Sequence, residues 1–376
     1  MNFPIYLDNA ATTQVHPMVL DAMLPYFLEN YGNSGSQQHL LGWQADEAIE
    51  KSRKVIANYF QVKSRQIIFT SGATESNNLA IQGYLKNFPD KGHIITTRTE
   101  HKSVLAVFQA LEKAGWNVSY LPVDQFGAID LNELRSSIQA KTRLISLMWV
   151  NNETGLIHPI KDVCQIAKEK NIVFHCDATQ ALGKIDISKG KLPDLISFSG
   201  HKIYGPKGIG GLVISNEDIQ IYPLVFGGDQ ERGLRSGTLP TQQIVGLAKA
   251  FELIPELLTK NEFYSKWKNR IADLLTTKFS ELVQINSSDN SVPSILNFSI
   301  KRFDWEEMFE KLSKLALSNG SACNAKSQKP SYVLQELGVP SATALSSIRL
   351  SMGYFITEEE MEVALVYLEQ QLNLMK

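Results

Sequence analysis

The fold and the chemistry of this chain are decided by one stretch, Ser197-Phe198-Ser199-Gly200-His201-Lys202-Ile203-Tyr204-Gly205-Pro206-Lys207-Gly208-Ile209-Gly210-Gly211. An apolar run typical of a short buried strand leads into Lys202, and a glycine-rich segment follows. Lysine is rarely buried without a partner, and glycines let a backbone or a ligand approach closely. An amine in this setting suits covalent bonding to a carbonyl group. A solvated lysine in a turn is the alternative, so the other parts of such a site must be sought elsewhere in the chain.

Around this stretch, helical patterns and short apolar strands alternate from about residue 16 to about residue 215. This alternation predicts an α/β protein whose mostly parallel sheet is covered by helices on both faces. After the helical region 240–278, shorter strands and helices predict a smaller α/β domain. We place the large domain at residues 14–255 and the small domain at residues 1–13 together with 256–376.

The composition limits the classes of function. The 376 residues include 37 basic and 39 acidic side chains, with a formal net charge of -2, so no basic surface for direct nucleic-acid binding is expected. The amino terminus lacks the pattern of a signal peptide, and the longest obvious apolar run, residues 144–150, is too short to span a bilayer. We therefore expect a cytoplasmic protein without membrane contact. The three cysteines show no CxxC spacing, which argues against a disulfide framework and a zinc site.

Open parallel sheets bind ligands at the carboxyl ends of their strands, so polar residues at strand ends are candidates for a site. Residues 66–77 indicate a strand, a turn of small residues and a helix start, where backbone N–H groups near Ala73 and Thr74 could bind a phosphate. An ordinary capped turn is the alternative. There is no Walker A pattern and no well-formed GxGxxG, so a nucleotide is the less favoured source of phosphate.

Three further strand ends carry side chains that suit pyridoxal phosphate, a cofactor that bonds to a lysine. Asp177 could pair with a protonated pyridine nitrogen, or it could cap a helix. His101 could stack on a flat ring or move protons near neutral pH, or it could be structural. Asn152 could offer an amide to the ring hydroxyl, or it could belong to a plain turn.

Two residues in the last third of the chain suit the substrate side of such a site. Cys323 lies in the polar segment 318–330, and a cysteine outside the core is a candidate reactive thiol. Arg349 lies in an otherwise apolar stretch, where it could hold a substrate carboxylate or form a structural salt bridge. Cys164 and Cys176 lie in apolar patterns and are expected to be buried.

With their neighbours, these motifs closely resemble those of the cysteine desulfurases, in the group related to the housekeeping iron–sulfur and nitrogenase-associated enzymes. The resemblance runs nearly from end to end and rests on residues 6–13 (YLDNAATT), 70–77 (TSGATESN), 99–102 (TEHK), 150–155 (VNNETG), 175–183, 197–210 and 230–238 (QERGLRSGT). It implies a fold-type I pyridoxal phosphate enzyme that forms a homodimer, with each active site at the subunit interface.

Position by position, the resemblance implies that Lys202 bonds covalently to the cofactor, that His101 stacks on its ring and that Asp177 pairs with the ring nitrogen. Asn152 and Gln180 would contact the ring substituents. The phosphate partners that it implies are Ala73, Thr74, Ser199, His201 and, from the other subunit, Thr238.

On the substrate side, the resemblance implies that Arg349 and Asn152 bind L-cysteine, with Arg349 on the carboxylate. Cys323, in the segment Gly320-Ser321-Ala322-Cys323, would accept the sulfur as a persulfide. Lys202 would move the α-proton, L-alanine would be released, and the sulfur would pass to a protein acceptor. No metal is implied.

Three features differ from many relatives. Residues 32–36 read Gly-Asn-Ser-Gly-Ser instead of beginning Gly-Asn-Pro, residues 227–229 read Gly-Gly-Asp instead of three glycines, and the sequence ends at Lys376, soon after the expected terminal helix. Housekeeping relatives continue into a tail that docks the iron–sulfur scaffold. The acceptor could therefore belong to iron–sulfur cluster assembly or to tRNA or DNA sulfur modification, and the 32–36 loop is a weak hint of DNA phosphorothioation.

Two other classes of function stay open at this point. A selenocysteine lyase or an aminotransferase of the same fold would retain Lys202 without a catalytic role for Cys323. A binding module that only receives sulfur through Cys323 would need no working cofactor site, and the presence of Lys202, Asp177 and His101 argues against it.

Overall fold

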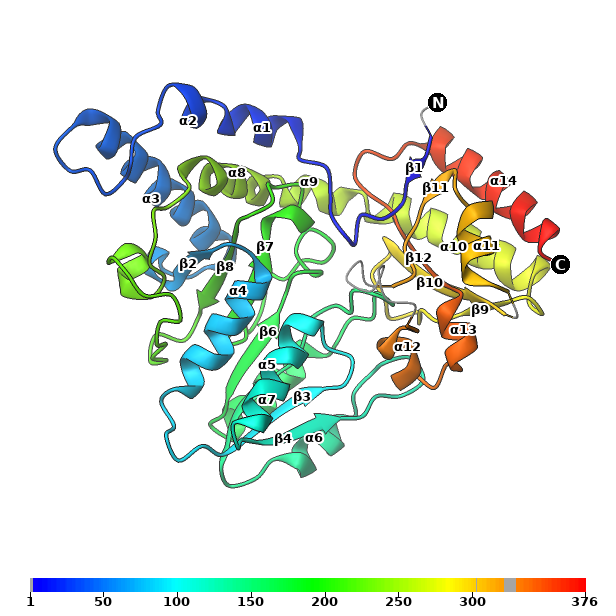
Figure 1. Ribbon diagram of the computed structural model, residues 1–376, viewed down its shortest axis with the longest axis horizontal. Helices are drawn as coiled ribbons and strands as arrows, with labels where there is room; N and C mark the ends of the chain where they lie inside the picture. The colour runs from blue at the N-terminus through cyan, green and yellow to red at the C-terminus, as the bar shows by residue number, and fades with distance from the viewer. Residues whose placement is uncertain (1–2, 302, 321–328) are drawn as a thin grey trace.

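The computed structural model describes residues 3–301, 303–320 and 329–376, and its largest element is a seven-stranded sheet (Figure 1). In spatial order the strands are β2 (Ile67–Thr70), β8 (Gly210–Ile214), β7 (Leu195–Ser199), β6 (Val173–Asp177), β5 (Thr142–Ser146), β3 (His93–Thr97) and β4 (Asn117–Leu121). The five strands from β7 to β4 are parallel, whereas β8 runs antiparallel to both of its neighbours. The predicted α/β class with a mostly parallel sheet is confirmed.

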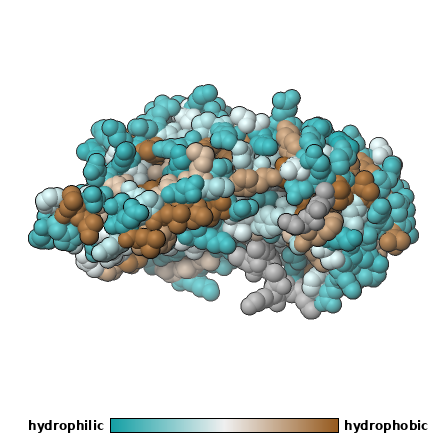
Figure 2. Space-filling view, turned by 90° about the horizontal axis from the view of Figure 1, so that it is seen from above, coloured by the Kyte–Doolittle hydropathy of each residue, from teal (hydrophilic) through white to brown (hydrophobic). Residues whose placement is uncertain are grey.

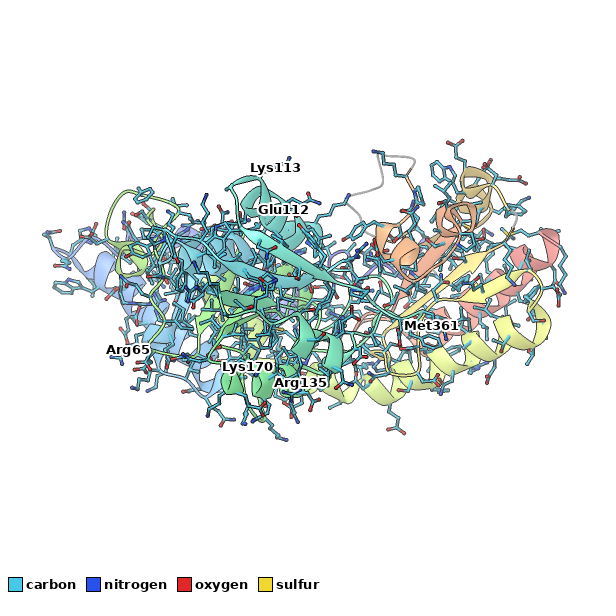
Figure 3. The ribbon with its side chains drawn as sticks, turned by 90° about the horizontal axis from the view of Figure 1, so that it is seen from below. Arg65, Glu112, Lys113, Arg135, Lys170 and Met361 are labelled. Carbon is cyan, nitrogen blue, oxygen red and sulfur yellow. The ribbon has the colours of Figure 1, made fainter. Side chains whose placement is uncertain are left out.

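Helices cover both faces of this sheet. They are α1 (Pro17–Met23), α2 (Pro25–Leu28), α3 (Leu40–Phe60), α4 (Ala73–Asn78), α5 (Lys102–Lys113), α6 (Leu131–Ser137), α7 (Ile160–Glu169) and α8 (Thr241–Glu252). Seen from below in Figure 3, α5 with its labelled Glu112 and Lys113 lies on one side of the strands. The labelled Arg135 of α6, and Lys170, which follows α7, lie on the other side.

The continuous apolar strands follow from this double cover. Every residue of β2, β3, β7 and β8 is buried, because helices shield both faces of the sheet. Phe198 of β7 packs edge-on against Phe251 of α8, with ring centroids 5.2 Å apart. The strand β5 ends at Ser146, before the end of the apolar run 144–150. Residues 147–150 are apolar because they are buried in the core beyond the strand end.

A second layered unit follows along the chain. Its antiparallel sheet has the order β12 (Ser347–Ser351), β10 (Ile295–Ile300) and β9 (Val283–Ile285), and β1 (Ile5–Tyr6) pairs with β11 (Leu315–Ala316) beside it. The helices of this part are α9 (Ile254–Thr259), α10 (Asn261–Lys278), α11 (Trp305–Lys311), α12 (Tyr332–Glu336), α13 (Ser341–Leu345) and α14 (Glu358–Leu374).

The second unit has a hydrophobic cluster of its own around the fully buried Trp267. Figure 1 shows this second unit, which includes β1, on the right. The strand β12, which holds Arg349, and the short helices α12 and α13 were not expected from the sequence. The domain boundary at residue 255 stays a prediction.

Across the described ranges, no helix is both long and apolar enough to cross a membrane.

A buried ion pair ties three parts of the large sheet region together. Arg53 of α3 and Glu231 of the 3-10 turn η4 (Gln230–Gly233) are joined by two hydrogen bonds of 2.7 Å, and their side chains are 3% and 0% exposed. The Glu231 carboxylate also accepts the backbone N–H of Phe69 in β2 at 2.7 Å. A bidentate pair of this kind fixes both position and orientation.

Glu231→Ala should lower the free energy of unfolding by roughly 3 kcal/mol, because it removes the bidentate partner of the buried Arg53 and the acceptor of the Phe69 N–H. Arg53 retains its contacts with Glu50 and with the carbonyl of Ile67. Urea unfolding followed by circular dichroism measures the effect.

The matched control is Glu217→Ala, since Glu217 forms a surface cluster with Lys63 and Arg65, where water and salt screen the charges and a much smaller loss is expected. Equal losses in the two variants would show that the buried pair does not stabilise the fold.

Candidate active site

A cavity of about 520 Å³ lies where the parallel strands of the large sheet end. It is lined by residues that are far apart in the sequence. Among them are Ala73, Thr74, His101, Asn152, Asp177, Gln180, Ser199, His201, Lys202 and Arg349, all predicted from the sequence. Thr238 is exposed and does not line this cavity. Cys323 lies outside the described residues.

Lys202 enters the cavity from the short turn η3 (Gly200–Lys202), which directly follows β7. Its Nζ donates to the carbonyl oxygens of Ala10 and Ala11, at 2.7 and 2.6 Å. Thr13 donates from its backbone N–H and its hydroxyl to the carbonyl of His201. Hydrogen bonds therefore fix the segment 8–13 against the turn that carries Lys202, and the carbonyl groups of this segment hold the amine in place.

Asp177 is the last residue of β6. Its Oδ2 accepts from Asn77 Nδ2 at 2.8 Å, and its Oδ1 accepts from the backbone N–H of Thr179 at 2.9 Å. Neither donor carries a charge, so the buried carboxylate suits a cationic ring nitrogen. Asn77 belongs to the recognised 70–77 motif, but a contact across 100 residues has no local signal in the sequence.

His101 precedes α5 and accepts the backbone N–H of Ser103 at Nδ1. Burial lowers the pKa of His101, and the charge of Lys202 lowers it further, while Asp177 acts in the opposite direction. The imidazole is thus kept neutral at physiological pH. A flat, uncharged ring at the cavity wall suits stacking on an aromatic cofactor.

Arg349 reaches the cavity from β12, in the second sheet. Its Nη2 pairs with Asp8 Oδ1 at 2.7 Å, and its Nη1 donates to the carbonyl of Asn152 at 2.9 Å. Its Nε is buried and has no partner among the described residues. The salt bridge expected as one alternative exists, and one donor of the fork is still available for a carboxylate.

Several buried polar atoms around the cavity lack a partner within the part of the chain that the structure describes. They are Asn152 Oδ1, Thr179 Oγ1, Gln180 Oε1 and Arg349 Nε. Unsatisfied buried groups are costly and rare in native proteins, so this set indicates a polar ligand. Thr179 was not predicted, although it lies in the same turn as Asp177 and Gln180.

The start of α4 lines the cavity with backbone N–H groups that suit an anion. Ala73 and Thr74 are its first two residues, as the sequence predicted, and first-turn N–H groups have no acceptor within a helix. Glu75 also lines the cavity, but its carboxylate is paired with Arg235 at 2.8 Å. This pairing reduces the repulsion that a bound phosphate would meet. Together with Asp177 and Lys202, the residues fit pyridoxal phosphate.

Comparisons with known proteins agree with this geometry. The model of the family "Aminotransferase class-V" matches residues 5–363. A cysteine desulfurase IscS of Rickettsia prowazekii is 43% identical over 368 residues, which cover 97% of this chain and 90% of the relative. A solved NifS-like protein superposes with a TM-score of 0.89 at 37% identity, covering 99% of this chain and 100% of the other. A structure described as SspA in complex with cysteine gives a TM-score of 0.82 at 36% identity, covering 94% and 100%.

The chain belongs to the cysteine desulfurases of the class-V aminotransferase family. Its family and its structural neighbours confirm the predicted fold-type I architecture, the dependence on pyridoxal phosphate and the desulfurase activity on cysteine. In the described part of this desulfurase, no group of three or more His, Cys, Asp or Glu side chains could hold a metal ion.

The two described cysteines of the desulfurase do not suit sulfur transfer. Cys164 and Cys176 are both buried, as predicted. Burial raises the pKa of Cys164 to about 12 and raises that of Cys176 strongly. Because the thiolate is the nucleophile, neither side chain is reactive near neutral pH.

Glu100 is a buried acid beside the desulfurase site that the sequence did not single out. Its Oε1 accepts the backbone N–H of Met148 at 2.6 Å, and its Oε2 is buried without a partner among the described atoms. Burial, and to a lesser degree Asp177, raise the pKa of Glu100 to about 8. The Glu100 side chain is therefore neutral at pH 7.

The gain in unfolding free energy of Glu100→Gln over wild type should be larger at pH 8 than at pH 5. The folded chain holds this proton up to about pH 8, whereas a free glutamate loses it near pH 4.5. The stability that comes from the neutral form is fully present below about pH 4.5 and is lost progressively as the pH rises to about 8. Glutamine cannot ionise, so the variant should gain up to about 4 kcal/mol over wild type between pH 5 and 8.

Urea unfolding at the two pH values measures this gain. Glu112→Gln, an exposed position on α5, is the control and should show no comparable gain. An equal response of both variants would contradict a buried neutral Glu100.

Proposed function

We propose that this desulfurase converts L-cysteine to L-alanine in the 520 Å³ cavity and accepts the sulfur on Cys323. The observation that carries the proposal is the convergence of Lys202, Asp177 and His101 on that cavity, beside unpaired polar groups. An amine, a carboxylate and a flat neutral ring are the partners that pyridoxal phosphate requires.

In this proposal the cofactor is held by residues from several strand ends. Lys202 binds it covalently, Asp177 pairs with its ring nitrogen, and His101 stacks on its ring. Asn152 and Gln180 contact the ring substituents through the side-chain oxygens that lack partners. The phosphate is bound by Ala73, Thr74, Ser199, His201 and, from a second subunit, Thr238.

The chain's own residues then carry out the proton and sulfur transfers. Arg349 holds the substrate carboxylate and Asn152 also contacts the substrate, which sets the α-carbon near Lys202. Bound pyridoxal phosphate supplies an electron sink conjugated to the α-carbon. Lys202 takes the α-proton, and burial keeps His201 neutral, with a pKa of about 4, so it adds no charge beside the amine.

Sulfur transfer needs a thiolate that can reach the substrate. The Cys323 thiolate attacks the substrate sulfur, an S–S bond forms and the Cβ–S bond breaks. A proton replaces sulfur on the β-carbon, so cysteine and one thiol become alanine and one persulfide. No external oxidant or reductant is consumed in this step. Cys323 is supported by the Gly-Ser-Ala-Cys motif and by the unreactive state of Cys164 and Cys176.

Cys323→Ser should lower the rate of alanine formation from L-cysteine by roughly 100-fold or more, because the attacking thiolate is lost. The absorbance band of the bound cofactor should be retained. Cys164→Ser is the matched control and should keep activity, because that thiol is protonated in the core. Alanine is quantified by amino-acid analysis in the presence of a reductant. Alanine formation at the wild-type rate in Cys323→Ser would contradict the role of Cys323 and favour a selenocysteine lyase. An aminotransferase would instead convert cysteine to a 2-oxo acid without forming alanine from it.

A homodimer is part of the proposal, and an apolar surface supports it. Large hydrophobic side chains are exposed on and around α1, α2 and the start of α3, namely Met18, Leu20, Leu24, Phe27, Leu28, Tyr31, Leu40 and Trp43. Figure 2 shows hydrophobic surface, in brown, on the half of the molecule where these helices lie. Exposed apolar surface of this extent indicates a protein interface. A second copy covering it agrees with the exposed position of Thr238, the residue assigned to the neighbouring site.

Phe27→Glu combined with Leu28→Glu should convert the dimer to a monomer and lower its cofactor content, because each site would lose the partner's Thr238. Analytical ultracentrifugation measures the mass, and absorbance measures the bound cofactor. Leu374→Glu, at an exposed position on α14, is the control and should leave the dimer intact. A dimeric double variant would place the interface elsewhere.

The acceptor of the persulfide sulfur is a protein in this proposal. This acceptor belongs to iron–sulfur cluster assembly or to the sulfur modification of tRNA or DNA. The near-neutral charge of the chain favours docking of a carrier protein over direct contact with nucleic acid.

A further inference from the structure

A second, smaller cavity of about 20 Å³ shares Lys202 with the active-site cavity. Its wall also contains Lys184, Ser294, Tyr204 and Tyr264. A cavity of this size holds one water molecule or one ion of similar size. None of the roles proposed above uses it.

Lys184 is fixed in this wall by its backbone. It follows the turn that carries Asp177 and Gln180, its N–H donates to the carbonyl of Ala181 at 3.1 Å, and its own carbonyl accepts from Asn261 Nδ2 at 2.9 Å. The amine at the end of the side chain is buried and has no hydrogen-bond partner among the described residues. The hydroxyl of Ser294 is also buried and equally without a partner there.

The charges around the cavity are positive. Lys184 and Lys202 line it, and no Asp or Glu is among its described lining residues. The two tyrosines stay neutral, because burial raises the pKa of Tyr204 to about 12 and raises that of Tyr264 further. Burial, then Lys202 and then Arg349 lower the pKa of Lys184 to about 7.

A buried ammonium group without a counter-charge is costly, so it either gives up its proton or gains an anion. The first state would leave a neutral amine and a water molecule in the cavity. The second state satisfies both orphaned groups at once, since an anion accepts from an ammonium and from a hydroxyl. The net positive surroundings favour the second state.

We propose that this cavity is a binding site for one small monovalent anion of the size of chloride, held by Lys184 Nζ and Ser294 Oγ next to Lys202. The bound anion offsets the repulsion between the two lysines. It thereby links the electrostatics of the catalytic amine to the anion content of the solution. This inference does not depend on which thiol accepts sulfur.

Crystals of the cofactor-loaded protein grown in sodium bromide test the location. An anomalous bromide peak within hydrogen-bonding reach of Lys184 Nζ and Ser294 Oγ is expected in wild type and should be absent in Lys184→Met. Density for a water molecule and no bromide would overturn the proposal.

Thermal unfolding of the same holoenzyme tests whether the anion binds in solution. Replacing gluconate by chloride at constant sodium should raise Tm at pH 6, by about 3 °C when chloride is 100 times its Kd. Because the anion holds the Lys184 proton, the rise should be smaller at pH 8.5, where the free amine is neutral.

Matched variants separate this site from general salt effects. Lys184→Met should lose the chloride response, and Ser294→Ala should reduce it. Lys189→Met removes a lysine whose side chain is 83% exposed and should keep the full response. Bromide density without a chloride effect on Tm would mean an adventitious ion only and would overturn the proposal, as would an equal effect in Lys184→Met. If Lys184→Met does not fold, the wild-type and Ser294→Ala measurements still decide the matter.

Discussion

The hydrogen bonds from Lys202 Nζ to the carbonyl oxygens of Ala10 and Ala11 are the contacts on which the rest of the site depends. They join the end of β7 to a segment from the very beginning of the chain. That same segment leads from β1, which pairs with β11 in the second unit. The amine is thus positioned by backbone atoms that are fixed from both halves of the molecule. Because backbone carbonyls carry no net charge, they hold the amine without forming an ion pair that a substrate would have to break.

The buried groups around this amine differ in their charge. Asp177 is held by the neutral donors Asn77 and Thr179, so its charge is available to a ligand. Burial keeps Glu100 protonated and His101 neutral. Asp177 and Lys202, the charged groups that the proposal assigns to the cofactor, line the cavity together with the neutral His101. Preorganised surroundings of this kind cost little reorganisation when the substrate reacts.

Much of the fold and of the site could be predicted from local sequence patterns. Lys202, Asp177 and Ala73 were found because each lies where an apolar strand gives way to polar or small residues, and parallel strand ends meet at one edge of a sheet. The strand β12 was missed because Ser347 to Ser351 contain only two apolar side chains around a buried arginine, whereas the strands of the large sheet were recognised as continuous apolar runs. Another reason explains why the sequence did not single out Asn77, Thr179, Glu100 and Lys184. Their importance comes from long-range contacts or from the lack of any contact, and neither leaves a trace in the neighbouring residues.

The sequence alone determined the α/β class, the family, the cofactor and the identity of most of the residues that converge on the cavity, because these follow from strand and helix periodicity and from motifs of fixed spacing. The tertiary structure decided which of those residues have all their hydrogen-bonding groups paired within the protein and which have groups that can bind a ligand. The salt bridge of Arg349 with Asp8 joins residues 341 positions apart. The side-chain oxygens of Asn152 and Gln180 lack hydrogen-bond partners among the described residues because of the groups that pack around them. The physical reason is that hydrogen bonding and burial are properties of neighbours in space, and the pKa values of Glu100 and Lys184 depend on that burial more than on residue type.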